Sequence, residues 1–250
     1  MVLAERTRRV MLADEWRGLV VLLMVVYHGL YDLVVFHGVD LPGFFTGWGR
    51  VLQLFICVSF ITISGLCCRF SHSNLRRGLL TFGLGMALTL ATAVATPEVV
   101  IRFGVLHLLG AAMLLYPPLR PLLDRLPAGW GAGLFAALFL LTFQVPQGTL
   151  GLGPLAATLP PALYQSRWLF WLGLPGPGFF SGDYFPLAPW LFLFLAGTFL
   201  GRFAAEGRLP AFVYQPHAPL LAAVGRRSIW VYLIHQPLLY GALQLLFALR

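Results

Sequence analysis

Seven stretches of about 20 mostly apolar residues recur from one end of this sequence to the other, and they constrain the fold more than any other feature. A helix that crosses the hydrocarbon core of a membrane needs about 20 such residues, because each residue adds about 1.5 Å. No long polar stretch separates them, so the sequence predicts an all-α, polytopic membrane helix bundle with a single domain over residues 1–250. The predicted spans are 17–36, 50–68, 78–95, 100–117, 129–145, 185–202 and 228–249.

The composition excludes an ordinary soluble domain. Charged residues make up 10% of the chain, whereas soluble domains carry about 25%. The net charge of +8 comes from arginines that lie between apolar stretches, so we expect contact with membrane lipid and no nucleic acid. Cys57, Cys67 and Cys68 lie in or beside one apolar stretch, without metal or redox spacing. We therefore expect packing cysteines, and neither a metal site nor disulfides.

The arginines are distributed unequally between alternate loops. Four of them (Arg50, Arg102, Arg167 and Arg250) fall on one side of the predicted bundle. The other thirteen are Arg6, Arg8, Arg9, Arg17, Arg69, Arg76, Arg77, Arg120, Arg125, Arg202, Arg208, Arg226 and Arg227. Loops rich in arginine stay in the cytoplasm, so we predict a cytoplasmic N-terminus and an outer C-terminus. No small-residue cleavage site follows the first apolar stretch, which we expect to remain as a membrane helix.

The longest connection, 146–184, lies on the predicted outer side and is rich in glycine, proline and aromatic residues. Trp168, Trp171 and Phe179 argue against disorder. We predict an outer interfacial segment near 160–182, with a short helix that covers the bundle. A plain aromatic belt at the membrane surface explains the same composition.

His28 and Asp32 are four residues apart on the first predicted helix, so their side chains share one face. We expect Asp32 to accept a hydrogen bond from one ring nitrogen of His28 and leave the other nitrogen free as a base. Ionisable groups are costly inside a membrane, which favours a functional site. A buried pair that only joins helices explains the spacing too.

His107 on the fourth predicted helix lies near the depth of Asp32, and Arg102 marks the outer start of that helix. We expect His107 to meet Asp32 if the first and fourth helices touch. A purely structural hydrogen bond at His107 is the alternative.

His235 on the seventh predicted helix precedes Gln236 and Pro237. Proline removes a backbone donor and tends to kink a helix, so His235 and Gln236 are expected to line a cavity. A structural kink with satisfied polar groups would need no ligand.

Two polar residues near the predicted outer surface complete the candidates. His37 follows the first helix, and Asp183 precedes the sixth. We expect Asp183 to cap the sixth helix or to contact substrate. His72 and His217 lie in cytoplasmic loops and are expected to be ordinary solvated histidines.

Five arginines on the predicted cytoplasmic side suit phosphate recognition, since a guanidinium forms bidentate hydrogen bonds. The positive-inside rule explains the same residues without a ligand. They are Arg17, Arg76, Arg77, Arg226 and Arg227.

An arginine at the cytoplasmic start of the first helix, with a histidine eleven residues later, resembles the transmembrane acyltransferase superfamily. The continuation from Tyr27 to Phe36, YHGLYDLVVF, resembles the heparan-alpha-glucosaminide N-acetyltransferase catalytic-domain family, especially its short bacterial members. Further stretches resemble that family in the same order. They are Ser64-Gly65, 75–78, 101–110, 183–186, 225–228 and 232–237.

The resemblance implies a membrane acyltransferase that passes an acetyl group from cytoplasmic acetyl-CoA to a sugar-like or other amine or hydroxyl acceptor on the outer side. It also implies a multi-pass protein of a bacterial inner membrane, with a homodimer as an open expectation. We expect this chain to lack the extra domain of the lysosomal members, so a glucosamine acceptor does not follow. In those enzymes a histidine after the first helix is catalytic, and His37 is its nearest counterpart here. We nevertheless favour His28, which belongs to the more widely shared pattern.

The predicted mechanism has His28 remove a proton from the acceptor, while Asp32 holds the imidazole. His107 or Arg102 would stabilise the oxyanion, His37, His235 and Asp183 would contact substrate, and the cytoplasmic arginines would hold the phosphates of acetyl-CoA. An acetyl-histidine route stays open. Two other classes remain: a small proton-coupled transporter with a relay of His28, Asp32 and His235, and a non-catalytic membrane scaffold.

Overall fold

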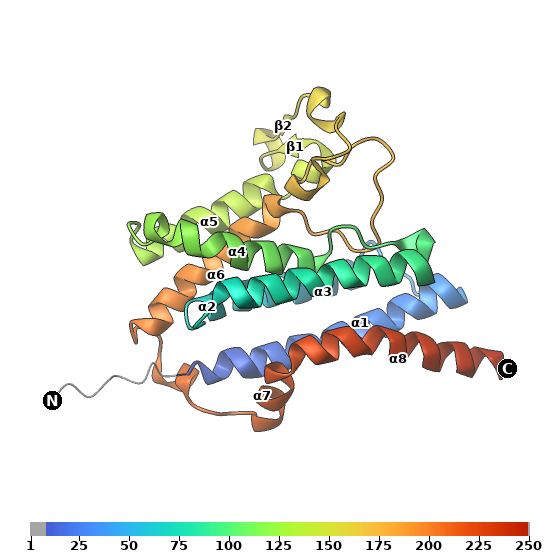
Figure 1. The fold of residues 1–250 in the computed structure, drawn as a ribbon, viewed down its shortest axis with the longest axis horizontal. Coiled ribbons are helices and arrows are strands. Elements are labelled where there is room, and N and C mark those ends of the chain that lie inside the picture. Colours follow the sequence, from blue (N-terminus) through green and yellow to red (C-terminus); the bar gives the residue numbers. More distant parts are fainter. Residues whose placement is uncertain (1–8, 250) are drawn as a thin grey trace. The chain divides into compact units, whose positions relative to one another are not determined.

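The computed structural model describes residues 9–249, and this part of the chain is mostly helical (Figure 1). Its eight α-helices are α1 (Met11–His37), α2 (Trp48–Cys68), α3 (Asn74–Ala95), α4 (Val105–Leu123), α5 (Ala128–Thr142), α6 (Leu187–Ala205), α7 (Pro219–Arg226) and α8 (Ser228–Ala248). All except α7 belong to the seven described spans that are long and apolar enough to cross a membrane. The prediction of an all-α membrane bundle with about seven spans is therefore confirmed.

The two largest differences from the predicted helix boundaries lie at the start of the first helix and the end of the fourth. The first helix begins six residues earlier than expected, at Met11. The fourth was expected to stop at Pro117, but α4 continues through three prolines to Leu123. Proline removes one backbone donor without forbidding helical dihedral angles, and neighbouring groups can re-satisfy the freed carbonyls in membrane helices.

The connection between α5 and α6 folds as turns and not as an α-helix. Strands β1 (Thr149–Leu150) and β2 (Ala157–Thr158) pair antiparallel. The single-turn 3-10 helices of the described chain are η1 (Pro97–Val99), η2 (Val145–Gln147), η3 (Gly153–Leu155), η4 (Pro161–Tyr164), η5 (Phe170–Leu172) and η6 (Ala211–Tyr214). The expected short helix near 160–182 was thus wrong, because frequent prolines and glycines interrupt the run of backbone donors that a helix needs.

The described chain divides into two compact units. The first unit contains residues up to Ile63 and those from Gly207 onward, and the second unit contains Ser64–Glu206. The first therefore holds α1, most of α2, α7 and α8, while the second holds α3 to α6 and the long connection between α5 and α6.

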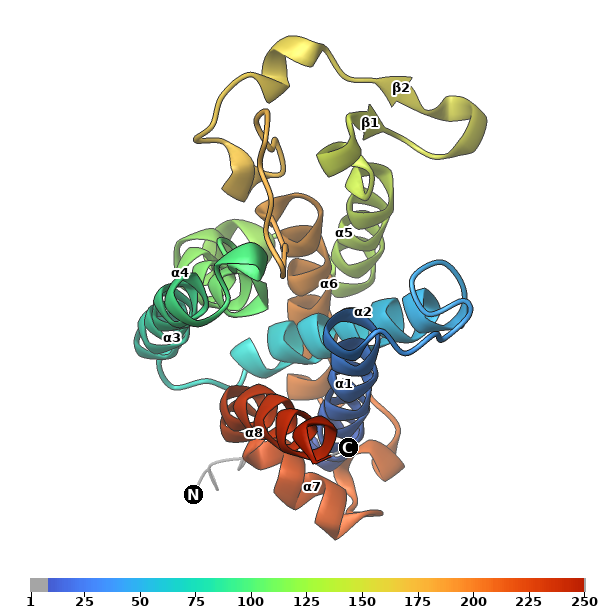
Figure 2. The same ribbon diagram turned by 90° about the vertical axis from the view of Figure 1, so that its right-hand side faces the viewer.

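In the first unit, α1 packs against both α7 and α8 (Figures 1 and 2). The packing against α7 is unusually close, since a Cβ on Gly18 would lie 1.9 Å from the carbonyl oxygen of Leu221. Glu15 fixes the same contact, because its Oε1 accepts the backbone N–H groups of His217 and Ala218 at 2.7 and 2.8 Å. His217, expected to be an ordinary solvated side chain, is exposed but joins the two helices through its backbone.

In the second unit, α3 pairs with α4 and α5 pairs with α6 (Figure 2). One end of this unit brings together three loops that were predicted to face the cytoplasm. Arg69 donates to Asp124 at 2.7 Å and to the Tyr116 hydroxyl at 3.0 Å, and Arg202 donates to the carbonyl of Leu126 at 2.9 Å. Burial would raise the pKa of Asp124, but hydrogen bonds from Arg69 and Arg120 outweigh it and lower the pKa.

A second contact joins the segment before α4 to the end of the long connection before α6. Phe103 and Tyr184 form an isolated parallel bridge, and the backbone N–H of Phe185 donates to the carbonyl of Phe103 at 2.8 Å. The sides of the membrane on which the loops lie stay a prediction. Three arginines of the charge comparison, Arg6, Arg8 and Arg250, lie outside the described residues.

Candidate functional site

Four polar side chains meet between α1 and α8, and we call them the α1–α8 polar cluster: His28, Asp32, His235 and Gln236. The side-chain amide of Gln236 donates to Asp32 Oδ1 at 2.7 Å. The imidazole rings of His28 and His235 lie edge to face, with centroids 5.0 Å apart. Asp32 is fully buried and His235 nearly so. Residues far apart in the sequence thus form one polar group within the first unit.

The cluster presents three buried acceptor atoms that have no hydrogen-bond partner in the described chain. They are Asp32 Oδ2, Gln236 Oε1 and His235 Nε2. His235 Nδ1 lies 2.7 Å from the carbonyl of Tyr232, and because a carbonyl only accepts, Nδ1 carries the proton. Nε2 of the neutral ring is then a bare acceptor. A ligand that fits the cluster must therefore bring N–H or O–H donors.

The predicted hydrogen bond between His28 and Asp32 is absent from the described structure. Asp32 is bonded across the helix pair to Gln236 instead. The ring of His28 packs edge to face against His235 and Tyr27. Asp32 and His28 lie one turn apart on α1 as expected, but Asp32 is bonded to Gln236 of the facing helix. Asp32 therefore does not hold the tautomer of His28.

His37 lies at the last turn of α1, where its ring stacks on Phe247 with centroids 4.0 Å apart. Its Nε2 is buried and has no partner within residues 9–249. The His28 ring lies against the rings of His235 and Tyr27. Both histidines of α1 therefore pack on aromatic neighbours, and the preference for His28 over His37 stays a prediction.

His107 belongs to the second unit, where both of its ring nitrogens are used. The backbone N–H of Gly104 donates to Nδ1 at 3.2 Å, so the ring proton lies on Nε2. Nε2 then donates to Thr89 Oγ1 at 3.2 Å, and the Thr89 hydroxyl donates to the carbonyl of Ile101 at 2.6 Å. These bonds fix the start of α4, which supports the structural alternative for His107. Asp32, its expected partner, belongs to the first unit.

Asp183 caps a helix, but not the helix that was expected. Its Oδ2 accepts the backbone N–H of Val105 at 3.0 Å and so caps α4. The N-cap of α6 is Pro186, which forms no side-chain bond. Burial raises the pKa of Asp183 to about 6, opposed by the hydrogen bond from Val105. The β-bridge between Phe103 and Tyr184 explains the difference, because it carries Asp183 beside the start of α4.

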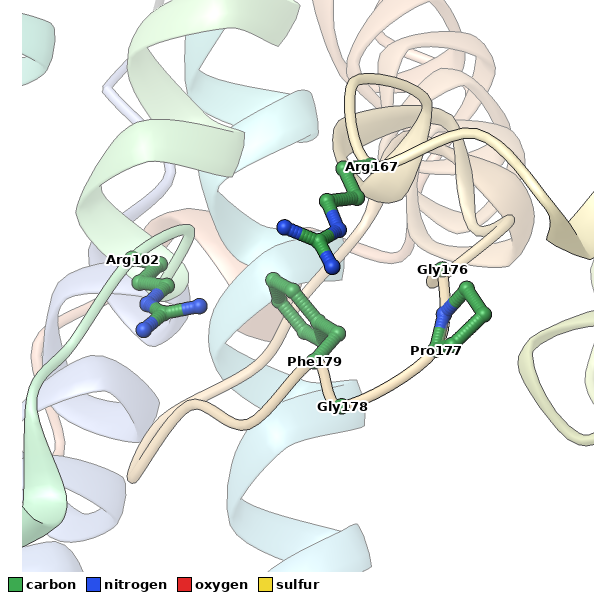
Figure 3. A pocket seen from close by; sticks show the side chains of 6 residues that line it. All are labelled: Arg102, Arg167, Gly176, Pro177, Gly178 and Phe179. Atoms are coloured by element: carbon green, nitrogen blue, oxygen red, sulfur yellow. The ribbon is translucent and has the colours of Figure 1, made fainter.

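Arg102 is exposed, and its guanidinium lies 5.8 Å from the centroid of the Phe179 ring. Arg167 lines the same cavity (Figure 3). The sequence prediction named Arg102 but missed Arg167 as a site residue. A signal was present, because Arg167 is the one charged residue between Arg125 and Asp183.

The five arginines predicted to bind phosphate are divided between the two units. Arg76 and Arg77 are exposed in the first turn of α3, in the second unit, and Arg226 and Arg227 are exposed where α7 meets α8, in the first. Arg17 on α1 lies 3.5 Å from the Asp14 carboxylate. Four of the five are therefore accessible. The described residues contain no group of three potential metal ligands.

Thr89 and Gln236 hold site residues in place, and neither was among the predicted site residues. Thr89 joins α3 to His107, and Gln236 joins α8 to Asp32. A threonine in an apolar helix is a weak indication of a site residue, since its hydroxyl often bonds a carbonyl of the preceding turn of its own helix. Gln236 was expected to line a cavity, but no sequence spacing links it to Asp32.

Apolar helices with a buried polar cluster between two of them define a multi-pass membrane protein with an intramembrane polar site. The family model for the catalytic region of heparan-alpha-glucosaminide N-acetyltransferase matches residues 9–237. The chain belongs to this family, whose name denotes acetyl transfer, and the resemblance seen in the sequence is confirmed. No curated protein and no solved structure gave a significant match.

Proposed function

We propose that the protein transfers an acetyl group from cytoplasmic acetyl-CoA to an amine or hydroxyl of an acceptor on the outer side of a bacterial inner membrane. The reaction site in this proposal is the α1–α8 polar cluster. The observation that carries it is the set of three buried acceptor atoms without donors, on Asp32, His235 and Gln236. Leaving such atoms unpaired costs about 1–3 kcal/mol each, so a ligand that supplies donors is strongly favoured.

An amine or hydroxyl acceptor matches this arrangement because it brings N–H or O–H groups. In the reaction, its nitrogen or oxygen attacks the thioester carbonyl carbon, forming a new C–N or C–O bond. The C–S bond breaks and the thiolate of CoA leaves. A base must take the proton that the acceptor loses, and histidine suits this task near neutral pH.

We assign to His28 the removal of the acceptor's proton, and to His235 the positioning of the acceptor. Nδ1 of His235 is anchored to the carbonyl of Tyr232, so its Nε2 has a fixed direction for accepting a hydrogen bond. His28 packs against that ring, and its side chain forms no hydrogen bond within residues 9–249. Its nitrogens are therefore available for proton transfer, and the carboxylate of Asp32 on the same helix favours the imidazolium that forms.

The donor side is assigned to two exposed arginines at the opposite, cytoplasmic end of the predicted topology. Arg226 and Arg227 lie in the same unit as the α1–α8 polar cluster and join α7 to α8. Guanidinium groups bind phosphate oxygens in bidentate fashion, which suits the phosphates of acetyl-CoA. A donor that enters from one side and an acceptor from the other explain why polar residues lie inside the membrane.

The test is acetyl transfer by the full chain in nanodiscs, with labelled acetyl-CoA and glucosamine as the probe acceptor. We expect saturable acetyl-CoA binding that is weakened by an Arg226→Gln, Arg227→Gln double variant. His28→Ala should keep this binding and lose at least about 100-fold in turnover, the contribution of a general base. His72→Ala, at an exposed histidine of the α2–α3 loop, is the matched control and should behave as wild type.

Two results would contradict the proposal. If folded protein does not bind acetyl-CoA, the donor assignment fails, and proton-coupled uptake into proteoliposomes becomes the next assay. If His28→Ala and His235→Gln both retain full turnover, acetyl transfer does not take place at the α1–α8 polar cluster.

A further inference from the structure

A cavity lies in the second unit, and its chemistry differs from that of the α1–α8 polar cluster. It measures about 280 Å³ and is lined by Arg102, Arg167, Phe179 and the turn at 176–178 (Figure 3). Small-molecule pockets generally begin near 300 Å³, so this cavity has room for about one ring-sized group. Its walls come from the start of α4 and from the long connection between α5 and α6.

Glycines hold the wall of this cavity in place. A Cβ on Gly176 would lie 2.6 Å from the carbonyl oxygen of Ser166, so the turn packs directly on the backbone that carries Arg167. Gly178 has a φ of +71°, a left-handed conformation that side chains disfavour. The backbone N–H of Phe179 closes the turn on Gly176 at 3.1 Å. The turn at 176–179 and the backbone at Arg167 therefore hold each other in place on one side of the cavity.

The cavity carries two positive charges that are not compensated nearby. Neither Arg102 nor Arg167 forms an ion pair within residues 9–249. The nearest acids in the sequence are Glu98, four residues before Arg102, which forms no ion pair with either arginine, and Asp183, whose Oδ2 is bonded to the N–H of Val105. Figure 3 shows the two guanidinium groups flanking the Phe179 ring. The Phe179 ring is itself stacked on Phe170 and lies under Arg102, so the groups left for a ligand are the two planar cations, which suit a carboxylate or phosphate.

We infer that the cavity between Arg102, Arg167 and Phe179 binds the carboxylate or phosphate group of a small anionic ligand. The two guanidinium groups would hold the anion, and Phe179, stacked on Phe170, would form the floor beside it. The contrast with the α1–α8 polar cluster is chemical, since that cluster offers acceptors without donors and this cavity offers donors without acceptors. The inference does not depend on acetyl transfer and is tested by binding alone.

The experiment is calorimetric binding of glucose 6-phosphate and of glucose to the full chain in an uncharged detergent. We expect glucose 6-phosphate to bind and glucose to bind at least roughly tenfold more weakly, as expected for loss of charge-assisted bonds. Arg102→Gln and Arg167→Gln should each weaken the binding of glucose 6-phosphate by a similar, roughly tenfold factor. Arg167→Lys should restore part of the loss. Arg50→Gln, at an exposed arginine elsewhere in the chain, should bind as wild type.

A second experiment, competition between lipids and glucose 6-phosphate in nanodiscs, distinguishes the source of the anion. If phosphatidylglycerol displaces glucose 6-phosphate and phosphatidylcholine does not, the natural group is a lipid headgroup; if neither lipid competes, it is a soluble or glycan-borne acid. Equal binding of glucose and glucose 6-phosphate, no binding of either, or unchanged binding by an Arg102→Gln, Arg167→Gln double variant would overturn the inference.

Discussion

Gln236 on α8 donates a hydrogen bond of 2.7 Å to Asp32 on α1, and this bond joins two residues 204 positions apart in the chain. It uses only one oxygen of the carboxyl and one end of the amide, because Asp32 Oδ2 and Gln236 Oε1 stay without partners in the described chain. The pair therefore links the two helices and at the same time leaves two acceptors for a ligand.

Gln236→Leu should destabilise the protein by about 1–3 kcal/mol, because it leaves the whole buried carboxyl of Asp32 unpaired. The double variant Asp32→Leu, Gln236→Leu should lose less than the sum of the two single variants, since it removes both polar groups together. The measurement is the free energy of unfolding in mixed micelles. Gln53→Leu, at an exposed bond with Arg50, is the control and should change stability by less than about 0.5 kcal/mol. Additive effects would show that the two side chains are not coupled.

Thr89→Val should destabilise the second unit without a specific effect on acetyl transfer. The substitution keeps the shape of the side chain but leaves His107 Nε2–H and the carbonyl of Ile101 without partners, at a cost of about 1–3 kcal/mol. Thr142→Val is the matched control, because its hydroxyl bonds only to its own helix. Melting temperature and turnover of the folded fraction are the two readouts. Loss of turnover at unchanged stability would instead give His107 a direct part in the chemistry.

The pKa of Asp183 predicts how stability depends on pH. Burial raises this pKa from 3.8 to about 6, so the folded state binds the proton more tightly than the unfolded state. The stabilisation is complete below the unfolded pKa near 3.8 and is lost as pH rises through 6. The corresponding change is at most about 3 kcal/mol, and solvent around the half-buried side chain reduces it.

Asp183→Asn tests this pH dependence, because asparagine keeps an oxygen that can accept the N–H of Val105 but does not titrate. As pH rises from 3.8 to about 6, the interval spanned by the two pKa values, the melting temperature of wild type should fall relative to that of the variant. Above this interval the difference should stay constant. A difference that does not vary with pH would mean that the carboxyl titrates alike in the folded and unfolded protein.

The helices could be predicted because hydrophobicity and length decide them locally. Seven spans follow from the apolar stretches, and the structure reproduces them within the described residues. The one α-helix that was missed, α7, has eight residues and too little apolar length to signal a span. The errors at Pro117 and at 160–182 came from proline, whose effect depends on the neighbouring backbone and not on the residue alone.

The site could be predicted only in part. An ionisable residue in an apolar helix marks a site because its burial is costly, but its hydrogen-bond partner depends on how the helices pack. His28, Asp32 and His235 were recognisable as ionisable groups in apolar helices. The hydrogen bond of Asp32 was assigned to the nearest residue on its own helix, although Gln236 of the facing helix forms it. Asp183 was similarly assigned to the nearest helix, although the β-bridge at Tyr184 delivers it to α4. In both cases the true partner is distant in sequence.

The close packing of α1 on α7 yields a prediction that separates packing from chemistry. A Cβ on Gly225 would lie 1.9 Å from the carbonyl oxygen of Asp14, and a rigid backbone atom cannot move aside as a side chain can. Gly225→Ala should therefore destabilise by about 1–3 kcal/mol or more, and Gly18→Ala by a similar amount. Gly241→Ala on α8, where a Cβ would meet nothing within 4 Å, should be neutral or stabilise by about 0.5–1 kcal/mol. Unfolding free energies of the three variants provide the measurement, and equal values at Gly225 and Gly241 would show that α7 does not pack on α1 in this way.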